Sequence, residues 1–349
     1  MVTWFKKGYT ARYMKLLTAP LSLLYGSVLA VRNWAFDRGL LTEHEFEVPV
    51  IAVGNLSVGG TGKSPMIEYL VSLLSTEYKV GVISRGYGRK TKGYLEVTTE
   101  HTSLEVGDEP RQFKQKFSEL TVVVCADRVK AIESLKDRCE VILLDDAFQH
   151  RYVRPAINIL LSQYQRPYHK DKVLPWGRLR EWSSGAKRAD VIVATKCPED
   201  LPHAKGQALQ FELKLDQKQS FYATTIAYGP HCVSTHDTID IDEFVALPFV
   251  LVTGIARPEP LVEALKKRGA RFEHFAFADH HNFTSSQVQK LRDQELILTT
   301  EKDYQRLVDK LKKHAIYYWP IKSKFLFDRQ EAFDLEILRR VAFHRSRLG

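Results

Sequence analysis

One stretch near the start of the chain, residues 51–74, constrains the fold more than any other. An apolar run over residues 48–53 predicts a buried strand, and a glycine-dense loop follows it. After the loop, apolar residues recur at helical spacing up to residue 74. A strand, a glycine loop that carries Lys63 and Ser64, and a helix, in that order, predict a phosphate-binding loop.

The chemistry of this loop follows from its backbone, since glycines let N–H groups turn toward phosphate oxygens. Lys63 would reach the β- and γ-phosphates of a nucleotide, and the Ser64 hydroxyl would ligate Mg²⁺. The usual pattern begins with glycine, whereas this chain has Ser57 there, and an ordinary glycine-rich turn is the alternative. The expected nucleotide-binding residues are Ser57, Val58, Gly59, Gly60, Thr61, Gly62, Lys63 and Ser64.

Composition limits the class of protein but does not choose its partner. A chain of 349 residues favours two domains, and its net charge of +9 suits a nucleotide, a nucleic acid or an anionic membrane. The four cysteines form no C-x-x-C pair, which indicates a reducing cytoplasm.

Residues 1–35 combine basic residues with an apolar run that carries no charge from Leu16 to Val31. This run is short for a spanning helix, which needs about 20 residues. Aromatic residues on both sides of it suit a membrane interface. We interpret the segment as a helix that lies in the membrane surface; the alternative is a helix packed on the domain.

A second apolar strand, residues 141–144, ends in Asp145 and Asp146. An acid at the end of such a strand, downstream of a phosphate loop, is the Walker B pattern, in which Asp145 would hold Mg²⁺ directly or through water. Further apolar runs alternate with helical stretches, which predicts an α/β fold with a mostly parallel sheet and helices on both faces. We place the P-loop NTPase-like domain at residues 36–205.

The second half of the chain changes pattern. Residues 207–228 alternate apolar and polar side chains, so we expect a two-stranded antiparallel linker over residues 206–230. A strand-loop-helix pattern then restarts and predicts a second, smaller α/β domain over residues 231–349.

Two polar clusters leave their roles open. Asp108 and Glu109 precede a proline and are consistent either with a helix N-terminus or with a catalytic base. The segment Asp279–His281 is consistent with a metal site, an acid/base unit or plain surface. The segment Thr299–Asp303 is similar to a guanine-recognition motif, but its spacing does not fit.

Together these pieces resemble one family, the tetraacyldisaccharide 4′-kinases, or lipid A 4′-kinases. The stretches that carry the resemblance are Val53–Pro65, Ser84–Arg89, Gly107–Pro110, Ala126–Arg128, Leu144–Arg151, Gly177–Glu181, Thr253–Pro258, Ala278–Thr284 and Thr300–Asp303.

The resemblance implies a transferase that uses ATP and Mg²⁺ to phosphorylate the 4′-hydroxyl of tetraacyldisaccharide 1-phosphate. The product would be lipid IV-A, a precursor of lipopolysaccharide. The family works at the cytoplasmic face of the Gram-negative inner membrane, which suits the N-terminal segment. It combines a P-loop domain, a second α/β domain and a two-stranded linker.

The resemblance also implies residue roles. Asp108 would be the catalytic base, assisted by His280, with Asp279 and His281 as supporting residues, and Lys63 would act on the phosphates. Mg²⁺ contacts map onto Ser64 and Glu181, with Asp145 nearby. Substrate and phosphate contacts map onto Arg128, Asp146, Gln149, His150 and Arg180.

Two other classes compete with this interpretation. A P-loop switch or metal chaperone would need a clean base-specificity motif and a metal-ligand cluster, and the sequence has neither. A basic nucleic-acid-binding ATPase explains the net charge of +9 but not the apolar N-terminus. We therefore expect a lipid substrate and a membrane surface, and no nucleic acid, as partners.

Overall fold

The computed structural model describes the backbone of residues 3–279, 281–312 and 314–348, and the side chains within residues 18–347 apart from 280 and 313. The chain forms two compact units, each made of separate segments. Unit 1 comprises Met1–Gly81, Asp127–Ile226 and Ser323–Gly349, and unit 2 comprises Val82–Ala126 and Ala227–Lys322. The continuous segments expected from the sequence therefore differ from the units, which interleave along the chain.

The sheet of unit 1 is mostly parallel, as predicted. The order of its strands is β15 (Ile321–Phe325), β8 (Ser220–Tyr228), β7 (Val191–Thr195), β6 (Ile157–Gln163), β1 (Val50–Asn55) and β5 (Val141–Asp145). β1 pairs in parallel with both β5 and β6, and β7 pairs in parallel with β6 and β8. Every residue of β1, β5, β6 and β7 is buried, as expected for strands covered on both faces.

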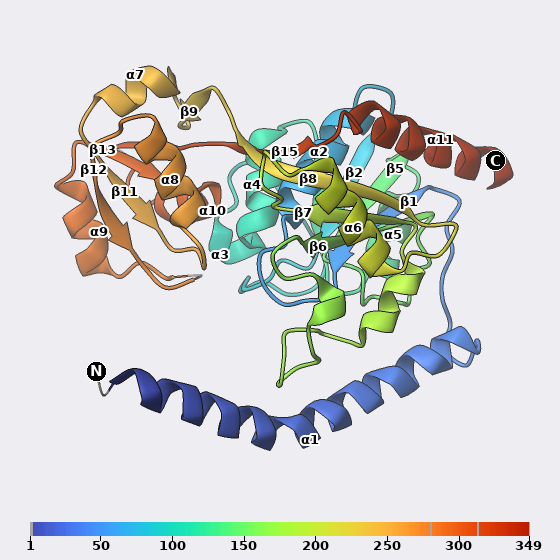
Figure 1. Ribbon diagram of the computed structural model, residues 1–349. Coiled ribbons are helices and arrows are strands. Elements are labelled where there is room, and N and C mark those ends of the chain that lie inside the picture. Colours follow the sequence, from blue (N-terminus) through green and yellow to red (C-terminus); the bar gives the residue numbers. More distant parts are fainter. Residues whose placement is uncertain (1–2, 280, 313, 349) are drawn as a thin grey trace. The chain divides into compact units, whose positions relative to one another are not determined.

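The helices of unit 1 can be followed in Figure 1. They are α1 (Thr3–Asp37), α2 (Lys63–Leu74), α5 (Arg128–Leu135), α6 (His203–Leu213) and α11 (Gln330–Leu348), with the 3₁₀ turns η1 (Tyr168–Lys170) and η2 (Ser183–Arg188). On α11, the residues Phe333, Ile337 and Val341 recur every four positions and are fully buried. This helical spacing is what packs one face of α11 on the core.

Unit 2 contains three strands whose order in the sheet is β2 (Val80–Ser84), β4 (Thr121–Val124) and β3 (Leu95–Glu96). Of β2, only the residues from 82 onward belong to this unit. Two helices, α3 (Ser103–Val106) and α4 (Asp108–Lys116), accompany these strands. It also has a six-stranded sheet in the order β10 (Thr238–Asp240), β9 (His231–Val233), β14 (Ala315–Tyr318), β13 (Leu296–Thr299), β11 (Phe249–Thr253) and β12 (Phe272–Ala276). The four last-named strands pair in parallel. Its helices are α7 (Ile241–Ala246), α8 (Glu259–Lys267), α9 (Ser285–Arg292) and α10 (Glu301–Leu307).

The hairpin predicted over residues 206–230 is wrong in its first half, which belongs to helix α6. Gly206, Leu209 and Leu213 are buried at helical spacing. The sequence of this segment is therefore compatible with a helix as well as with the alternating pattern of a strand. Only β8 is extended, and it pairs with β7. The chain passes from one unit to the other at residues 226 and 322, which lie within β8 and β15. These two strands are neighbours in the sheet although they are far apart in sequence.

Candidate active site

The phosphate loop lies between β1 and α2, as the sequence predicts. Its helix begins at Lys63, and the preceding Gly62 has φ of 89°, a conformation that favours glycine. Gly59 has φ of 103°, and a Cβ atom there would overlap the Arg178 guanidinium. The backbone conformation at both positions therefore favours glycine.

Side chains from four places hold the loop carbonyls. The Asn55 Nδ2 donates to the Ser57 carbonyl at 2.7 Å, and the Arg178 Nη2 donates to the Val58 carbonyl at 2.6 Å. Gln163 donates to the carbonyl of residue 60 at 2.6 Å, and the Thr195 hydroxyl donates to that of residue 61 at 2.8 Å. With its carbonyls engaged from outside, the loop is preorganised to offer N–H groups to an anion.

The Walker B acids lie beside the phosphate loop. β1 and β5 run in parallel with Val53 opposite Asp145, so both strands end at the same edge of the sheet. Asp145 is buried, and the next residue, Asp146, has a positive φ of 50°. This turn directs the Asp146 carboxylate to Lys63, whose Nζ lies 3.5 Å from Oδ1.

Two cations share the Asp146 carboxylate. The Arg180 Nη1 also binds Oδ1, at 2.8 Å. Burial by itself would raise the pKa of Asp146, but the charges of Lys63 and Arg180 lower it overall. The structure thus joins a predicted catalytic residue to two predicted substrate contacts.

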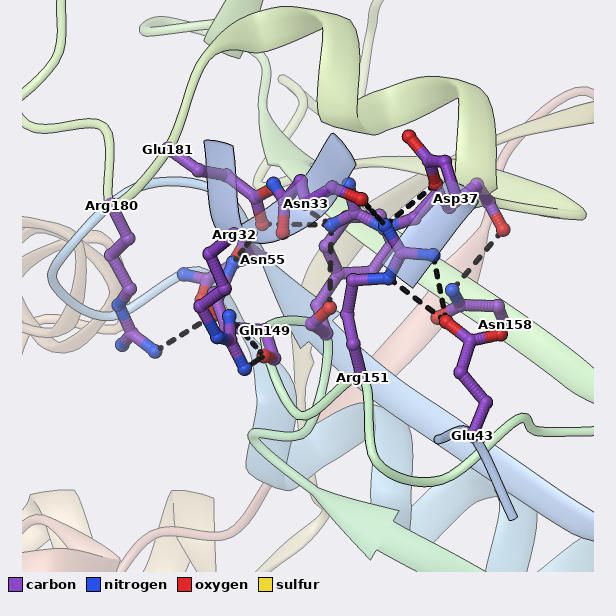
Figure 2. A network of polar contacts seen from close by, with 12 residues as sticks. Arg32, Asn33, Asp37, Glu43, Asn55, Gln149, Arg151, Asn158, Arg180 and Glu181 are labelled. Carbon is purple, nitrogen blue, oxygen red and sulfur yellow. Dashed lines mark hydrogen bonds and ion pairs between the residues drawn. The ribbon is translucent and has the colours of Figure 1, made fainter. Parts of the chain in front are cut away.

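A polar network extends from this ion pair (Figure 2). The Gln149 Nε2 donates to the Asn55 carbonyl at 2.9 Å and to the Glu181 Oε1 at 3.0 Å. Glu181 is buried, and the Arg188 Nη2 donates to both its oxygens, at 2.8 and 2.9 Å. Glu181 and Gln149, two residues expected at the site, are therefore in direct contact.

Helix α1 contributes to the same network from the N-terminal segment. The Asn33 Nδ2 donates to the Glu181 Oε2 at 2.8 Å, and Arg32 donates to the Gln149 carbonyl at 3.3 Å (Figure 2). The Trp182 indole donates to the Gly26 carbonyl at 2.8 Å. The C-terminal half of α1 thus packs on other parts of unit 1, and its polar face reaches the candidate site.

The same half of α1 exposes an apolar face. Leu21, Leu24, Val28 and Val31 lie at helical spacing and are 58–65% exposed. Among the helices that the structure describes, none is long and apolar enough to cross a bilayer. In the described part of α1, one face therefore packs on the domain and another, apolar face is exposed.

Two predicted substrate residues lie at the edge of the network. Arg128 is buried, and its Nη2 donates to the Asp145 carbonyl at 3.5 Å. His150 is partly buried, with its ring 5.8 Å from that of Tyr152. In this arrangement, Arg128 supports the end of β5.

In unit 2, Asp108 is the first residue of α4 and does not cap it. The N-cap is Gly107, which makes no side-chain cap hydrogen bond. The Asp108 carboxylate pairs instead with Arg306 of α10, whose Nε lies 2.9 Å from Oδ2. The neighbouring Glu109 pairs with Lys302 of the same helix. Asp108 and Glu109 therefore lie in the first turn of α4, as the helix N-terminus interpretation expected, although neither side chain is the N-cap.

The segment Asp279–His281 is described only in part, because His280 lies outside the described residues. His281 shares a hydrogen bond of 2.8 Å with Gln287 and stacks on Phe277 at 4.7 Å. Within the described part of the chain, no group of three or more His, Cys, Asp or Glu side chains is arranged to hold a metal ion. His281 thus has a packing role in this structure.

Sequence reasoning missed several residues of the network. Asn55 is the last residue of the buried strand β1 and the polar residue at the end of its apolar run, a signal that was present. Arg178 lies in the Gly177–Glu181 stretch, but the sequence analysis assigned it no role. Asn33 and Arg188 carry no such signal, and the Glu181 partner of Asn33 lies 148 residues away. The same holds for Arg306, which contacts Asp108.

Comparisons with known proteins give a consistent result. A family model described as tetraacyldisaccharide-1-P 4′-kinase, LpxK, matches residues 14–342. The tetraacyldisaccharide 4′-kinase of Flavobacterium johnsoniae is 43% identical over 92% of this chain and 95% of its own. That of Phocaeicola vulgatus is 41% identical over 91% and 93%. The crystal structure of "apo" form LpxK from Aquifex aeolicus in complex with ATP covers 94% of this chain and 99% of its own, with a TM-score of 0.77 and 29% identity.

Proposed function

The chain belongs to the tetraacyldisaccharide-1-P 4′-kinase family, and from that membership we propose how its residues carry out the reaction of a lipid A 4′-kinase. The proposed reaction transfers the γ-phosphate of ATP to the 4′-hydroxyl of tetraacyldisaccharide 1-phosphate and gives lipid IV-A. The observation that carries it is the convergence of Lys63 and Arg180 on Asp146 beside a closed phosphate loop. This arrangement places two cations where phosphoryl transfer requires charge neutralisation.

The phosphate loop binds the ATP phosphates through its N–H groups, with Lys63 on the β- and γ-phosphates. The Aquifex aeolicus LpxK with ATP bound supports this assignment, since it is similar over nearly the whole chain. Asp146 is a counter-ion of Lys63, with Nζ 3.5 Å from Oδ1. A phosphate would replace that long contact with a shorter, charge-assisted hydrogen bond.

The donor set near the loop fits Mg²⁺. This ion takes one or two carboxylates together with substrate phosphates and waters, and Ser64 and Asp145 are buried oxygen donors at the loop and at the end of β5. Glu181 would exchange contacts with Asn33, Gln149 or Arg188 to join them. Mg²⁺ held by these residues would supply positive charge to the phosphates during transfer.

Asp108 is the proposed base for the sugar hydroxyl. A hydroxyl is a weak nucleophile and loses its proton as its oxygen bonds to the γ-phosphorus and ADP departs. Asp108 would take that proton, assisted by His280, which lies outside the described residues. The lining of the acceptor site by Arg128, Gln149 and His150 is part of the same proposal.

The exposed apolar face of α1 supports association with the cytoplasmic face of the inner membrane. A tetraacylated lipid stays in the bilayer, so the enzyme must reach its surface. Leu21, Leu24, Val28 and Val31 would enter the headgroup region, and the basic residues that precede them in the sequence would meet anionic lipid, at about 1 kcal/mol each.

The test is transfer of label from γ-labelled ATP to tetraacyldisaccharide 1-phosphate in mixed micelles. Wild type is compared with Lys63→Ala and Asp108→Ala, each checked for folding by circular dichroism. Label in the lipid from wild type and a loss of about 10²–10⁴ in turnover in Asp108→Ala would support the proposal. ATP hydrolysis without labelled lipid would refute it.

A further inference from the structure

A chain of contacts within unit 2 leads from the end of β11 to Asp108. The backbone N–H of Gly254 donates to the Asp303 Oδ2 at 2.8 Å, and the Thr300 hydroxyl donates to the same oxygen at 2.7 Å. The other oxygen of Asp303 lies 3.3 Å from the Arg306 Nη1. Arg306 in turn binds the Oδ2 of Asp108 through Nε and Nη2.

This chain is deeply placed. The side chain of Asp303 is 0% exposed, that of Arg306 is 10% exposed and that of Asp108 is 14% exposed. A carboxylate fully removed from water remains only if donors satisfy it, and here a backbone N–H, a hydroxyl and a guanidinium do so. Because the Asp303 carboxylate is anchored by a backbone N–H and a side-chain hydroxyl, it fixes the direction in which Arg306 extends.

The three charged groups act on one another's pKa values. Burial raises the pKa of Asp303 overall, although hydrogen bonds from Gly254 and Thr300 and the charge of Arg306 oppose that rise. Burial alone would lower the pKa of Arg306, but Asp108 and Asp303 raise it overall. Arg306 therefore remains a cation between two acids.

The contact to Asp108 is one-sided. Among the described residues, both guanidinium contacts of Arg306 with Asp108 end on Oδ2, and neither involves Oδ1. A guanidinium bound to one oxygen restricts rotation of the carboxylate and turns the other oxygen in a fixed direction. That is what a base needs if it is to meet a hydroxyl at hydrogen-bond distance.

We propose that Arg306 is a positioning residue for Asp108 and that Asp303, from the T-E-K-D stretch, positions Arg306. This inference rests on the proposed role of Asp108 as the base. It assigns the Asp108 Oδ1 to the proton of the sugar hydroxyl and Oδ2 to Arg306. It also gives Thr300–Asp303 a function that its poor match to a base-recognition motif left unexplained.

A matched control lies between the same two helices. Arg111 of α4 forms a two-pronged pair with Asp309, just past α10, at 2.7 and 2.9 Å. This pair joins the same elements without touching Asp108. A loss that comes only from weaker packing of α4 against α10 would therefore appear in Asp309→Asn as well.

The experiment measures kcat, the KM for ATP and the unfolding temperature of Arg306→Gln, Arg306→Lys, Asp309→Asn, Asp108→Asn and the double variant Asp108→Asn/Arg306→Gln. We expect Arg306→Gln to lower kcat by up to about 10²-fold with the KM for ATP unchanged, because a small displacement of a reacting group has that effect. Arg306→Lys keeps the charge but lacks the planar guanidinium, so its kcat should lie between that of Arg306→Gln and that of wild type. Asp309→Asn should lower the unfolding temperature with kcat unchanged.

The double variant decides the mechanism. In the Asp108→Asn background no base remains to be positioned, so Arg306→Gln should lower kcat no further. An additive loss, or an equal loss of kcat in Asp309→Asn, would overturn the proposal. The single variant Asp108→Asn tests the base assignment separately: wild-type turnover there would refute the base itself, whatever Arg306→Gln does.

Discussion

Lys63 and Asp146 form an ion pair between the phosphate loop and the residue that follows β5, with Nζ 3.5 Å from Oδ1. Arg180 binds the same oxygen at 2.8 Å. One carboxylate thus holds both cations that we assign to phosphates. A nucleotide entering the site would find these charges already oriented, which lowers the cost of ordering them on binding.

The first prediction concerns the pH dependence of this cluster. The folded state lowers the pKa of Asp146, so its ion pairs contribute stability above the ordinary Asp value of about 3.9 and lose it as pH falls through the lowered value. We expect the difference in unfolding temperature between wild type and Asp146→Asn to be largest near about pH 7 and to shrink below about pH 4. Thermal unfolding across that range measures it, and a difference that does not depend on pH would contradict the ion pairs.

The second prediction concerns the glycines of the loop. Gly59→Ala should weaken ATP affinity by about tenfold or more, because a positive φ costs a non-glycine residue about 1–3 kcal/mol and the new Cβ would overlap Arg178. Gly60→Ala is the matched comparison, since its φ is not positive and its nearest neighbour is the flexible Lys196 Nζ at 3.8 Å. Calorimetric titration with ATP should show a clearly smaller loss there; equal losses would argue against the loop conformation.

The third prediction concerns the buried carboxylate of Glu181. Glu181→Gln would leave the Arg188 guanidinium without its counter-ion, and we expect a loss of about 1–3 kcal/mol in the free energy of unfolding. Glu199→Gln is the control, because its pair with Lys324 is exposed and such pairs contribute about 0–1 kcal/mol. Urea unfolding compares the two variants, and similar losses would show that the Glu181 network is not a stabilising one.

The fourth prediction concerns the apolar face of α1. Leu24→Glu combined with Val28→Glu should reduce binding to vesicles that contain anionic lipid, since both side chains are more than half exposed. Phe211→Glu removes an exposed apolar side chain from α6 in the same unit and serves as the control. Flotation should separate the first variant from wild type and leave the control with it. Unchanged flotation of the α1 variant would rule out this face as the membrane contact.

Local patterns predicted much of the fold. The phosphate loop, the parallel strands β1, β5, β6 and β7 and the second α/β sheet all follow from periodicity and glycine placement over short windows. The hairpin over residues 206–230 failed because a short alternating run is also compatible with a helix, and packing of Leu209 and Leu213 decided between them. The interleaved units were not predictable, because the grouping of residues 82–126 with residues 227–322 depends on contacts distant in sequence.

Some residues of the candidate site could likewise be predicted from the sequence, and others could not. Lys63, Ser64 and Asp145 are recognisable from spacing alone, and Gln149, Arg180 and Glu181 needed the resemblance to a family. Asn33 and Arg188 were missed, although both bind Glu181. Such residues have no motif of their own, since any polar side chain of suitable length could occupy their positions.

By itself the sequence determined the phosphate loop and the acid-ended strand, because backbone conformation and strand ends depend on residues close together in the chain. Only the tertiary structure decided that Asp146 would hold Lys63, that α1 would reach Glu181 and that Arg306 would bind Asp108. These pairs join residues that are far apart in sequence. Their contact depends on how buried helices and strands pack, which local preference does not specify.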